Sequence, residues 1–253
     1  MKDLNSSRCF RALKTIVAIC SLGVVMTASA AEVDVTKAVG YEESDWRVKS
    51  HQAFLKDHAK RISTTLLFLG DSITQGWTST WIKHHGMETW KTTLKGYAKV
   101  NLGLSSDRVE HVLWRVTEGK EIDHFTAKVI ILMIGTNNGG ETPEIVAARI
   151  EHLLKVLREK RPEAKILLLG VLPVAWRMQK SVQINELICK FADNETIFYR
   201  DYSKLFLTED GKKTVNLHDG IHPDAKGYEE WGKALVADLP EIMNGKKAEA
   251  AAE

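Results

Sequence analysis

The chain has 253 residues, of which 44% are hydrophobic and 27% are charged, and its formal net charge is +2. This composition fits one globular domain with a sizeable core and excludes intrinsic disorder. No repeat occurs at solenoid or propeller periods, and no basic cluster of the kind that nucleic-acid binding requires is present, so we expect no nucleic-acid partner.

The first thirty residues have the pattern of a secretory signal peptide. A basic start is followed by the short apolar stretch TIVAICSLGVVM and by small residues at 28–30. We predict cleavage after Ala30 and export to the periplasm or beyond, with no stable membrane insertion afterwards. Two alternatives are a membrane anchor, although the apolar stretch is shorter than the ~20 residues that span a bilayer, and a lipoprotein modified at Cys20, where bulky Ile19 precedes the cysteine. The basic residues are Lys2, Arg8, Arg11 and Lys14.

Removal of this segment changes both the charge and the cysteine count. The segment carries four basic side chains and one acidic side chain, so the formal charge falls from +2 to −1. Cys9 and Cys20 leave with it, and only Cys189 remains. The mature chain therefore cannot form an intrachain disulfide, although export permits one. Cys189 lies in an apolar helical pattern, which we interpret as packing.

Residues 31–60 are expected to form an N-terminal extension with a helix that packs on the main domain, residues 61–243. Residues 244–253 are expected to form a flexible tail. Within the domain, five runs rich in Val, Ile and Leu mostly lack polar alternation, which is typical of strands buried on both faces. They cover residues 65–69, 98–102, 128–134, 165–171 and 196–202.

Helical patterns alternate with these strands. In the strongest one, Thr142 is a suitable N-cap, Pro143 suits the first helical position and Glu144 suits the positive end of the helix. Alternating strands and helices joined by right-handed crossovers give a parallel sheet with helices on both faces. Such sheets bind ligands at the carboxyl ends of their strands. The other expected helices cover residues 105–118, 178–192 and 223–243.

A serine stands just past the first expected strand, in LLFLGDSITQGW. A serine hydroxyl becomes a nucleophile when a base removes its proton, and that base is usually a histidine oriented by a carboxylate. Asp219 and His222 in LHDGIHPDAKGY are three residues apart and can face each other within one turn. We therefore predict Ser72 as nucleophile, His222 as base and Asp219 as its partner, with a rate that rises with pH through about 6.5, the ordinary range of histidine.

Acyl transfer also requires hydrogen-bond donors for the developing oxyanion, each worth roughly 2.7–4 kcal/mol in related hydrolases. Two candidates follow the next two strands: the backbone N–H of Gly103 and the side-chain amide of Asn137. The Ser72 N–H would be a third donor. Four strand exits thus supply the nucleophile, the donors and the base.

Four sequence blocks, GDSIT, NLGLSSDRVEHVLWRV, MIGTNN and DGIHPD, occur in this order. They resemble the four blocks of the SGNH (GDSL-like) hydrolases. VLWRV, GTNN and AKILLLGVLP further resemble the branch with the platelet-activating-factor acetylhydrolase catalytic subunits and their bacterial relatives. The resemblance implies a flavodoxin-like three-layer α/β/α fold with a five-stranded parallel sheet. It also implies ester hydrolysis without a metal or cofactor, and a homodimer.

Carried over by position, the resemblance implies Ser72, Asp219 and His222 as the triad and Ser72, Gly103 and Asn137 as the oxyanion hole. Two segments depart from the branch. Sequences of that branch usually have a block similar to GIGGD where this chain has GLSSD. They often continue with Arg-Gly after the segment similar to LLLGVLP, where this chain has VAWR. These departures concern the substrate more than the chemistry.

Other residues near the blocks have two interpretations. Asp71, Trp77, Asp107 and Trp176 are candidate site-lining residues. We favour a bracing role for Asp71 and Asp107 over a catalytic one. Trp77, with Trp81 and Trp90, could form a sugar platform or an acyl wall, or simply pack. Asn138 is interpreted as structural.

The sequence gives less support for a catalytic or metal-binding role of the histidines outside the predicted triad. His218 could replace His222 as base, but its spacing to Asp219 is less suitable. His84, His85 and His218 could suggest a metal site, but no carboxylate lies at ligand spacing, and surface histidines are favoured. We expect no metal.

These observations predict an exported serine esterase, and the resemblance implies short-acyl esters, such as acetyl groups on glycans, as its substrates. An alternative is a lysophospholipase or lipase-like enzyme for longer acyl chains. A third alternative is a catalytically silent glycan-binding protein on the same fold, against which the complete set of catalytic residue types argues.

Overall fold

The computed structural model describes residues 33–60, 62–79 and 86–244. The chain divides into two compact units, Met1–Asp34 and Val35–Glu253, and the architecture below is that of the second. The predicted signal peptide lies outside the described residues, as do Trp81, His84 and His85. Of the predicted tail, residues 245–253 lie outside them, whereas Asn244 is the last residue of a helix. Within the described ranges, no helix is both long enough and apolar enough to cross a membrane.

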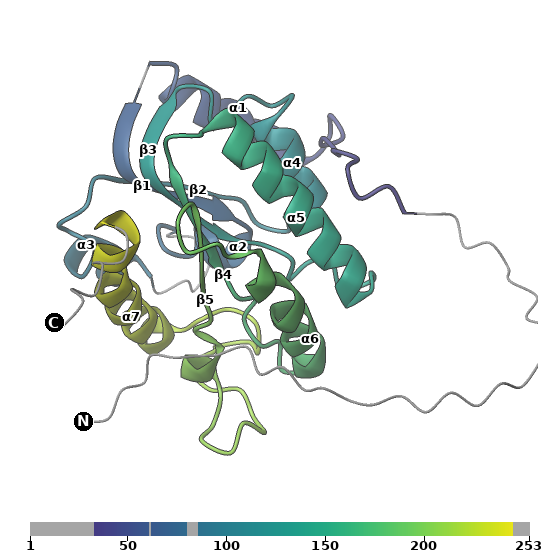
Figure 1. Ribbon diagram of the computed structural model, residues 1–253, viewed down its shortest axis with the longest axis vertical. Helices are drawn as coiled ribbons and strands as arrows, with labels where there is room; N and C mark the ends of the chain where they lie inside the picture. The colour runs from purple at the N-terminus through teal and green to yellow at the C-terminus, as the bar shows by residue number, and fades with distance from the viewer. Residues whose placement is uncertain (1–32, 61, 80–85, 245–253) are drawn as a thin grey trace, which may run out of the picture. The chain divides into compact units, whose positions relative to one another are not determined.

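Five parallel strands form one sheet with the order β2-β1-β3-β4-β5 (Figure 1). In the register of the three strands β2, β1 and β3, Gly70 pairs with both Gly103 and Met133, so these strands end at the same level. Their carboxyl ends therefore present three consecutive loops side by side. The strands are β1 Ile62–Gly70, β2 Lys99–Gly103, β3 Phe125–Met133, β4 Lys165–Leu169 and β5 Ile197–Arg200.

Helices cover both faces of the sheet, as Figure 1 shows. On one face, alternate strand residues such as Leu67 and Ile130 form a core with α4, α5 and α6, against which Phe54 of α1 packs. On the other face, Leu66, Phe68 and their neighbours form a core with α7 and Trp77. This alternation is what a sheet buried on both faces requires. The helices are α1 Trp46–Asp57, α2 Ser72–Gln75, α3 Met87–Thr92, α4 Val109–Val116, α5 Pro143–Lys160, α6 Met178–Ile188 and α7 Ala225–Asn244. Two 3-10 turns are η1 Cys189–Phe191 and η2 Ser203–Phe206.

Helix α5 begins as its sequence predicts. The Thr142 hydroxyl accepts a hydrogen bond from the Ile145 N–H, and Pro143 occupies the first turn. Two other helices start later than expected. Helix α4 begins at Val109 because Ser106 has a left-handed backbone (φ 65°). Helix α7 begins at Ala225 because Pro223 pairs with Leu217 in an isolated antiparallel bridge instead.

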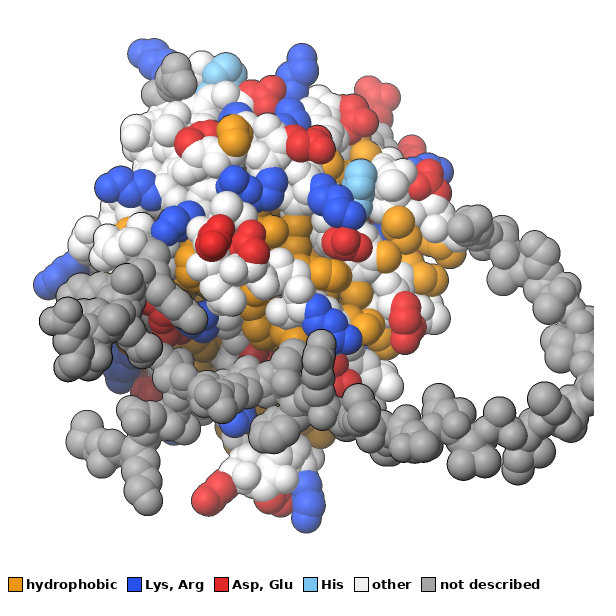
Figure 2. All heavy atoms as spheres, viewed as in Figure 1, with side chains coloured by type: hydrophobic (Ala, Val, Ile, Leu, Met, Phe, Trp, Pro, Cys, Tyr) orange, Lys and Arg blue, Asp and Glu red, His pale blue; other side chains and the backbone are white. Residues whose placement is uncertain are grey.

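Charged side chains of both signs are interspersed on the face in Figure 2, with apolar side chains between them. No large area of one sign is visible on this face. This distribution agrees with the absence of a clustered basic run in the sequence.

Candidate active site

The turn after β1 places Ser72 at the first position of α2. The Asp71 carboxylate accepts a hydrogen bond from the Ile73 N–H at 2.9 Å and so caps the helix. A Cβ on Gly70 would lie only 2.2 Å from Thr74 Oγ1 and 2.3 Å from the Met133 carbonyl oxygen, so the turn requires glycine there. Because Ser72 is the first residue of the helix, its N–H has no intrahelical acceptor.

The loop before α7 holds His222 through Asp219. One oxygen of the Asp219 carboxylate accepts the N–H groups of Ile221 (3.0 Å) and His222 (2.8 Å). The His218 N–H donates to the His222 carbonyl oxygen at 3.0 Å. These bonds close a compact turn, so the direction of the His222 ring is fixed by its own loop.

Ser72, His222 and Asp219 form one hydrogen-bonded chain. Ser72 Oγ lies 2.8 Å from His222 Nε2, and His222 Nδ1 lies 2.7 Å from the second Asp219 oxygen. Desolvation by itself would raise the pKa of Asp219, but the hydrogen bonds from His222 and Ile221 lower it to about 2. Asp219 is therefore a carboxylate at any ordinary pH, which favours a proton on His222 Nδ1 and leaves Nε2 to accept the serine proton.

The structure does not support Gly103 as an oxyanion donor. Its N–H donates to the side-chain oxygen of Asn101 at 2.8 Å. A Cβ on Gly103 would lie 2.2 Å from the Gln75 backbone nitrogen, so this glycine permits β2 to approach α2 closely. The expectation for Gly103 is thus corrected: its N–H is already bonded and its role is packing.

The sequence does not predict a role for the backbone N–H of Ser106. In the loop of residues 103–107, every other backbone N–H has an acceptor in the described part of the chain, but the Ser106 N–H has none there. Ser106 also has a positive φ of 65°, which is unusual for a residue other than glycine. The sequence signal for this position is the serine in GLSSD, at a place where the similar branch usually has a glycine.

Asn137 lies next to this loop, as predicted. Its side-chain nitrogen donates to the Asp107 carbonyl oxygen at 2.9 Å, which leaves its second amide hydrogen for another acceptor. Asn138 is structural, since its side chain accepts the Val109 N–H and donates to Glu110. The loops after β2 and β3 are thus joined by two adjacent asparagines.

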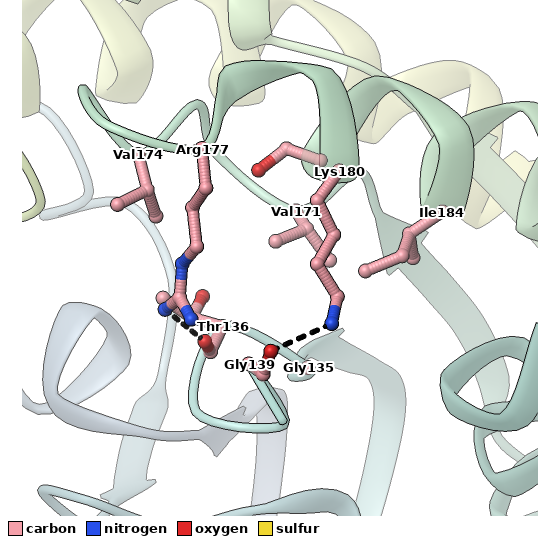
Figure 3. A pocket seen from close by; sticks show the side chains of 9 residues that line it. Gly135, Thr136, Gly139, Val171, Val174, Arg177, Lys180 and Ile184 are labelled. Atoms are coloured by element: carbon pink, nitrogen blue, oxygen red, sulfur yellow. Dashed lines mark hydrogen bonds between the residues drawn. The ribbon is translucent and has the colours of Figure 1, made fainter. Parts of the chain in front are cut away.

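Two cations from the start of α6 fix the loop after β3. Arg177 donates to the Thr136 carbonyl oxygen at 2.6 Å, and Lys180 donates to the Gly139 carbonyl oxygen at 2.8 Å. Figure 3 shows both side chains reaching from α6 to this loop across a small pocket. The pocket lining contains none of Ser72, Asp219 and His222.

Asp71 and Asp107 are fully buried and brace the site rather than line it. Desolvation raises the pKa of Asp71 to about 7. Desolvation also raises the pKa of Asp107 to about 6, although the Arg115 guanidinium, 2.9 Å away, opposes the rise. Neither carboxyl has access to a bound ester, so their candidate site-lining role is corrected to a supporting one.

The two tryptophans proposed to line the site have opposite environments. Trp77 is fully buried against Tyr228 and Trp231 and cannot meet a substrate, so the site-lining expectation is wrong for it. Trp176 is 66% exposed, and its ring lies 3.4 Å from where a Cβ on Gly220 would be. The Ala175 N–H donates to the Gly220 carbonyl oxygen, so Trp176 is held beside the loop that carries His222.

His218, Asp219 and His222 also have ligand atoms within 4.8 Å of one another, a spacing that a metal ion could use. The same atoms of Asp219 and His222 are joined by the 2.7 Å hydrogen bond described above. A metal at this place would have to replace that bond. The donor set therefore fits a hydrogen-bonded pair better than a metal centre.

Comparisons with known proteins agree with this geometry. The chain is 29% identical over 201 residues to human platelet-activating factor acetylhydrolase IB subunit alpha1, covering 76% of this chain and 82% of that protein. It is 30% identical over 205 residues to subunit alpha2 of Rattus norvegicus, covering 78% and 84%.

Solved structures of low sequence identity share the fold. A putative acylhydrolase from Bacteroides fragilis superposes with a TM-score of 0.63 at 20% identity, covering 79% of this chain and 100% of that one. A carbohydrate acetylesterase from Sinorhizobium meliloti superposes with a TM-score of 0.55 at 21% identity, covering 72% and 100%. The model of the GDSL-like lipase/acylhydrolase family matches residues 68–230. The chain belongs to this family and is a carboxylic ester hydrolase with its three-layer α/β/α fold.

Proposed function

We propose that the protein is an exported serine esterase in which Ser72 attacks the ester carbonyl carbon. The hydrogen-bonded chain from Ser72 through His222 to Asp219 carries this proposal. His222 Nε2 takes the hydroxyl proton as the Ser72 Oγ–carbon bond forms, and returns it to the departing alcohol as the ester bond breaks. Water then attacks the acyl carbon as His222 takes a proton from it, and His222 returns that proton to Ser72 Oγ as the Oγ–carbon bond breaks and the acid is released.

The proposed oxyanion donors are the Ser72 N–H, the second amide hydrogen of Asn137 and the Ser106 N–H. The Ser106 N–H is proposed as a donor because it has no acceptor in the described part of the chain. Gly103 is not proposed because its N–H donates to the Asn101 side chain. Donors aimed at the position where negative charge develops stabilise the transition state more than the bound ester.

We further propose a small acyl group, with acetyl esters of glycans as the substrate class. The names of two similar proteins, an acetylhydrolase and a carbohydrate acetylesterase, support a short acyl group. Exposed Trp176 beside the His222 loop offers a flat apolar surface for the leaving group. The N-terminal pattern supports the proposed export. The resemblance also implies a homodimer, which light scattering on the mature chain tests.

The experiment that tests this function measures hydrolysis of p-nitrophenyl esters from acetate to palmitate, and then of acetylated xylan and a lysophospholipid, with EDTA present. We expect a preference for acetate and release of acetate from the glycan. Trp176→Ala should weaken turnover of the glycan while leaving p-nitrophenyl acetate almost unaffected. Activity that grows with chain length would favour the alternative, an enzyme for long-chain lipids.

A further inference from the structure

The segment before β1 packs on α4 and on the loop that follows β2. The Val39 N–H donates to the Glu110 carbonyl oxygen at 3.1 Å. A Cβ on Gly40 would lie 3.0 Å from the ring of Trp114, and the Tyr41 ring meets the same tryptophan edge-on at 5.6 Å. The segment is therefore fixed on the outer side of the loop that carries Ser106.

Two side chains of this segment reach the loop itself. Arg47 Nη1 donates to the Ser106 carbonyl oxygen at 3.2 Å, and the Tyr41 hydroxyl donates to Asp107 Oδ1 at 2.7 Å. The Arg47 guanidinium is held in place by the Asp45 carboxylate, 2.6 Å away, and by the Tyr41 ring, whose centroid is 4.6 Å away. These contacts therefore hold the Arg47 guanidinium in the orientation in which it donates to the loop.

These contacts are made next to the strained part of the loop backbone, at Ser106. Ser106 has a left-handed backbone, which a residue with a Cβ adopts only when its surroundings enforce it. Asp107, the next residue, receives Arg115 on its other carboxylate oxygen and Asn137 on its carbonyl oxygen. The carbonyl of Ser106 and the carboxylate of Asp107 are thus anchored from the N-terminal segment. That anchoring also fixes the directions of the Ser106 N–H and the Asn137 amide.

We propose that Arg47 and Tyr41 are positioning residues, which hold the Ser106 N–H and the Asn137 amide toward the oxyanion. This inference rests on the esterase function proposed above. Without Arg47, Ser106 can relax to an ordinary backbone conformation, and its N–H then turns away from the site. The donors act mainly on the transition state, so the loss falls on kcat rather than on KM.

The protein provides a matched control cluster far along the chain. There Tyr202 donates to Asp238 at 2.6 Å, and Arg200 lies 3.3 Å from the same carboxylate. A tyrosine and an arginine thus contact Asp238, as they contact Asp107. Tyr202→Phe and Arg200→Met make the same chemical changes between β5 and α7.

The test compares kcat and KM for p-nitrophenyl acetate in the full chain. We expect Arg47→Met to lower kcat by about 10- to 100-fold, and Tyr41→Phe to lower it by a smaller factor. KM should stay within about twofold of the wild type in both, because the oxyanion forms only after binding. The two control variants should lower the melting temperature without lowering kcat. Arg47→Lys keeps the charge without the planar fork and serves if the Met variant does not fold.

A second readout separates positioning from general stability. Glycine adopts positive φ without strain, so Ser106→Gly added to Arg47→Met should recover a large part of the lost kcat. Unchanged kcat in both Arg47 variants and in Tyr41→Phe would overturn the inference. So would a drop in kcat that is the same in Arg47→Met as in the two control variants. The esterase proposal fails separately, if turnover does not depend on Ser72.

Discussion

Three aspartates near the nucleophile differ in charge state because their surroundings differ. Asp219 accepts hydrogen bonds from His222 and Ile221, which lower its pKa to about 2 despite desolvation. Asp71 and Asp107 are buried, and desolvation raises their pKa values to about 7 and 6. Only Asp219 combines a permanent negative charge with contact to the histidine ring. This contrast explains why the nearest carboxylate in sequence, Asp71, is not the one that orients His222.

Asp219→Asn should lower kcat/KM by about 10²-fold or more, up to the ~10⁴ typical of this change in triads. The amide oxygen can still accept the backbone N–H groups, so the loop should keep its shape. The amide nitrogen would face His222 Nδ1 and favour the tautomer that cannot accept the serine proton. Steady-state kinetics with p-nitrophenyl acetate measures the loss.

Asp224→Asn is the control for that loss, because Asp224 lies on the same loop and accepts the Gly227 N–H at 2.8 Å. It should retain kcat/KM near the wild-type value. Wild-type kinetics in Asp219→Asn would show that the carboxylate does not orient the base.

Asp71→Asn should stabilise the protein increasingly as pH rises from about 4 to about 8. The folded-state pKa of about 7 lies above the unfolded value of about 3.9, so the folded state holds a proton that the unfolded state has lost. Wild-type stability therefore falls as pH rises through this window. The amide avoids this loss, on the order of a few kcal/mol, and it can still cap the Ile73 N–H.

Melting temperatures of both proteins across this pH range measure the effect. Asp193→Asn is a control of opposite sign, since hydrogen bonds from residues 195–197, of which that from Thr196 Oγ1 is the strongest, outweigh desolvation and lower the pKa of Asp193. That substitution should destabilise at neutral pH, with the difference shrinking in acid. A pH-independent difference between Asp71→Asn and the wild type would contradict a raised pKa.

At the scale of elements, the site depends on how closely α2 lies against β2. Gly103 makes this approach possible, and the side chain of Asn101 bonds both to the Thr74 carbonyl oxygen and to the Gly103 N–H. A polar side chain in the middle of the short strand β2 thus fixes the turn after β1. The position of Ser72 is therefore determined by two strands and not by its own turn alone.

Gly103→Ala should lower the free energy of unfolding by several kcal/mol, since backbone atoms of Gln75 lie 2.2 Å from the added carbon and cannot move freely. Chemical denaturation measures the change. Gly96→Ala is the matched control, because a Cβ there meets nothing within 4 Å and should leave stability almost unaltered. Equal stability of the two variants would contradict the packing role assigned to Gly103.

The sequence predicts the elements, and that Ser72, His222 and Asp219 lie close together, for a physical reason. Uninterrupted apolar runs identify buried strands, and the carboxyl ends of parallel strands meet at one edge, so Ser72 and Asn137 were expected to be close. The sequence does not show which backbone N–H remains unpaired. The missing side chain of Gly103 suggests a free N–H, but that N–H donates to the Asn101 side chain, a contact that only the folded chain shows. Trp77 was misplaced for a similar reason, since its burial depends on α7.

At the scale of the whole molecule, the charge of the mature chain depends on whether its first thirty residues are removed. They account for the basic excess, and the remaining chain has a formal charge of −1. The basic pI of the full sequence, about 8.3, therefore gives no reason to expect an acidic macromolecular partner.

We predict that the protein isolated from an exporting host begins at Ala31. The small residues at 28–30 are the predicted cleavage site, and the apolar stretch before them is shorter than the ~20 residues that span a bilayer. N-terminal sequencing and the intact mass measure the start directly. An uncleaved chain in the membrane fraction would support an anchor instead, and a lipid attached at Cys20 would support a lipoprotein.

The central claim is that Ser72 is the nucleophile of an esterase, and hydrolysis of p-nitrophenyl acetate by the wild type beside Ser72→Ala tests it most directly. We predict turnover by the wild type and a loss of at least 10³-fold in the variant, with an unchanged melting profile. A folded Ser72→Ala that hydrolyses the ester as fast as the wild type would contradict the claim. A folded wild type that hydrolyses no ester of any chain length would contradict it equally.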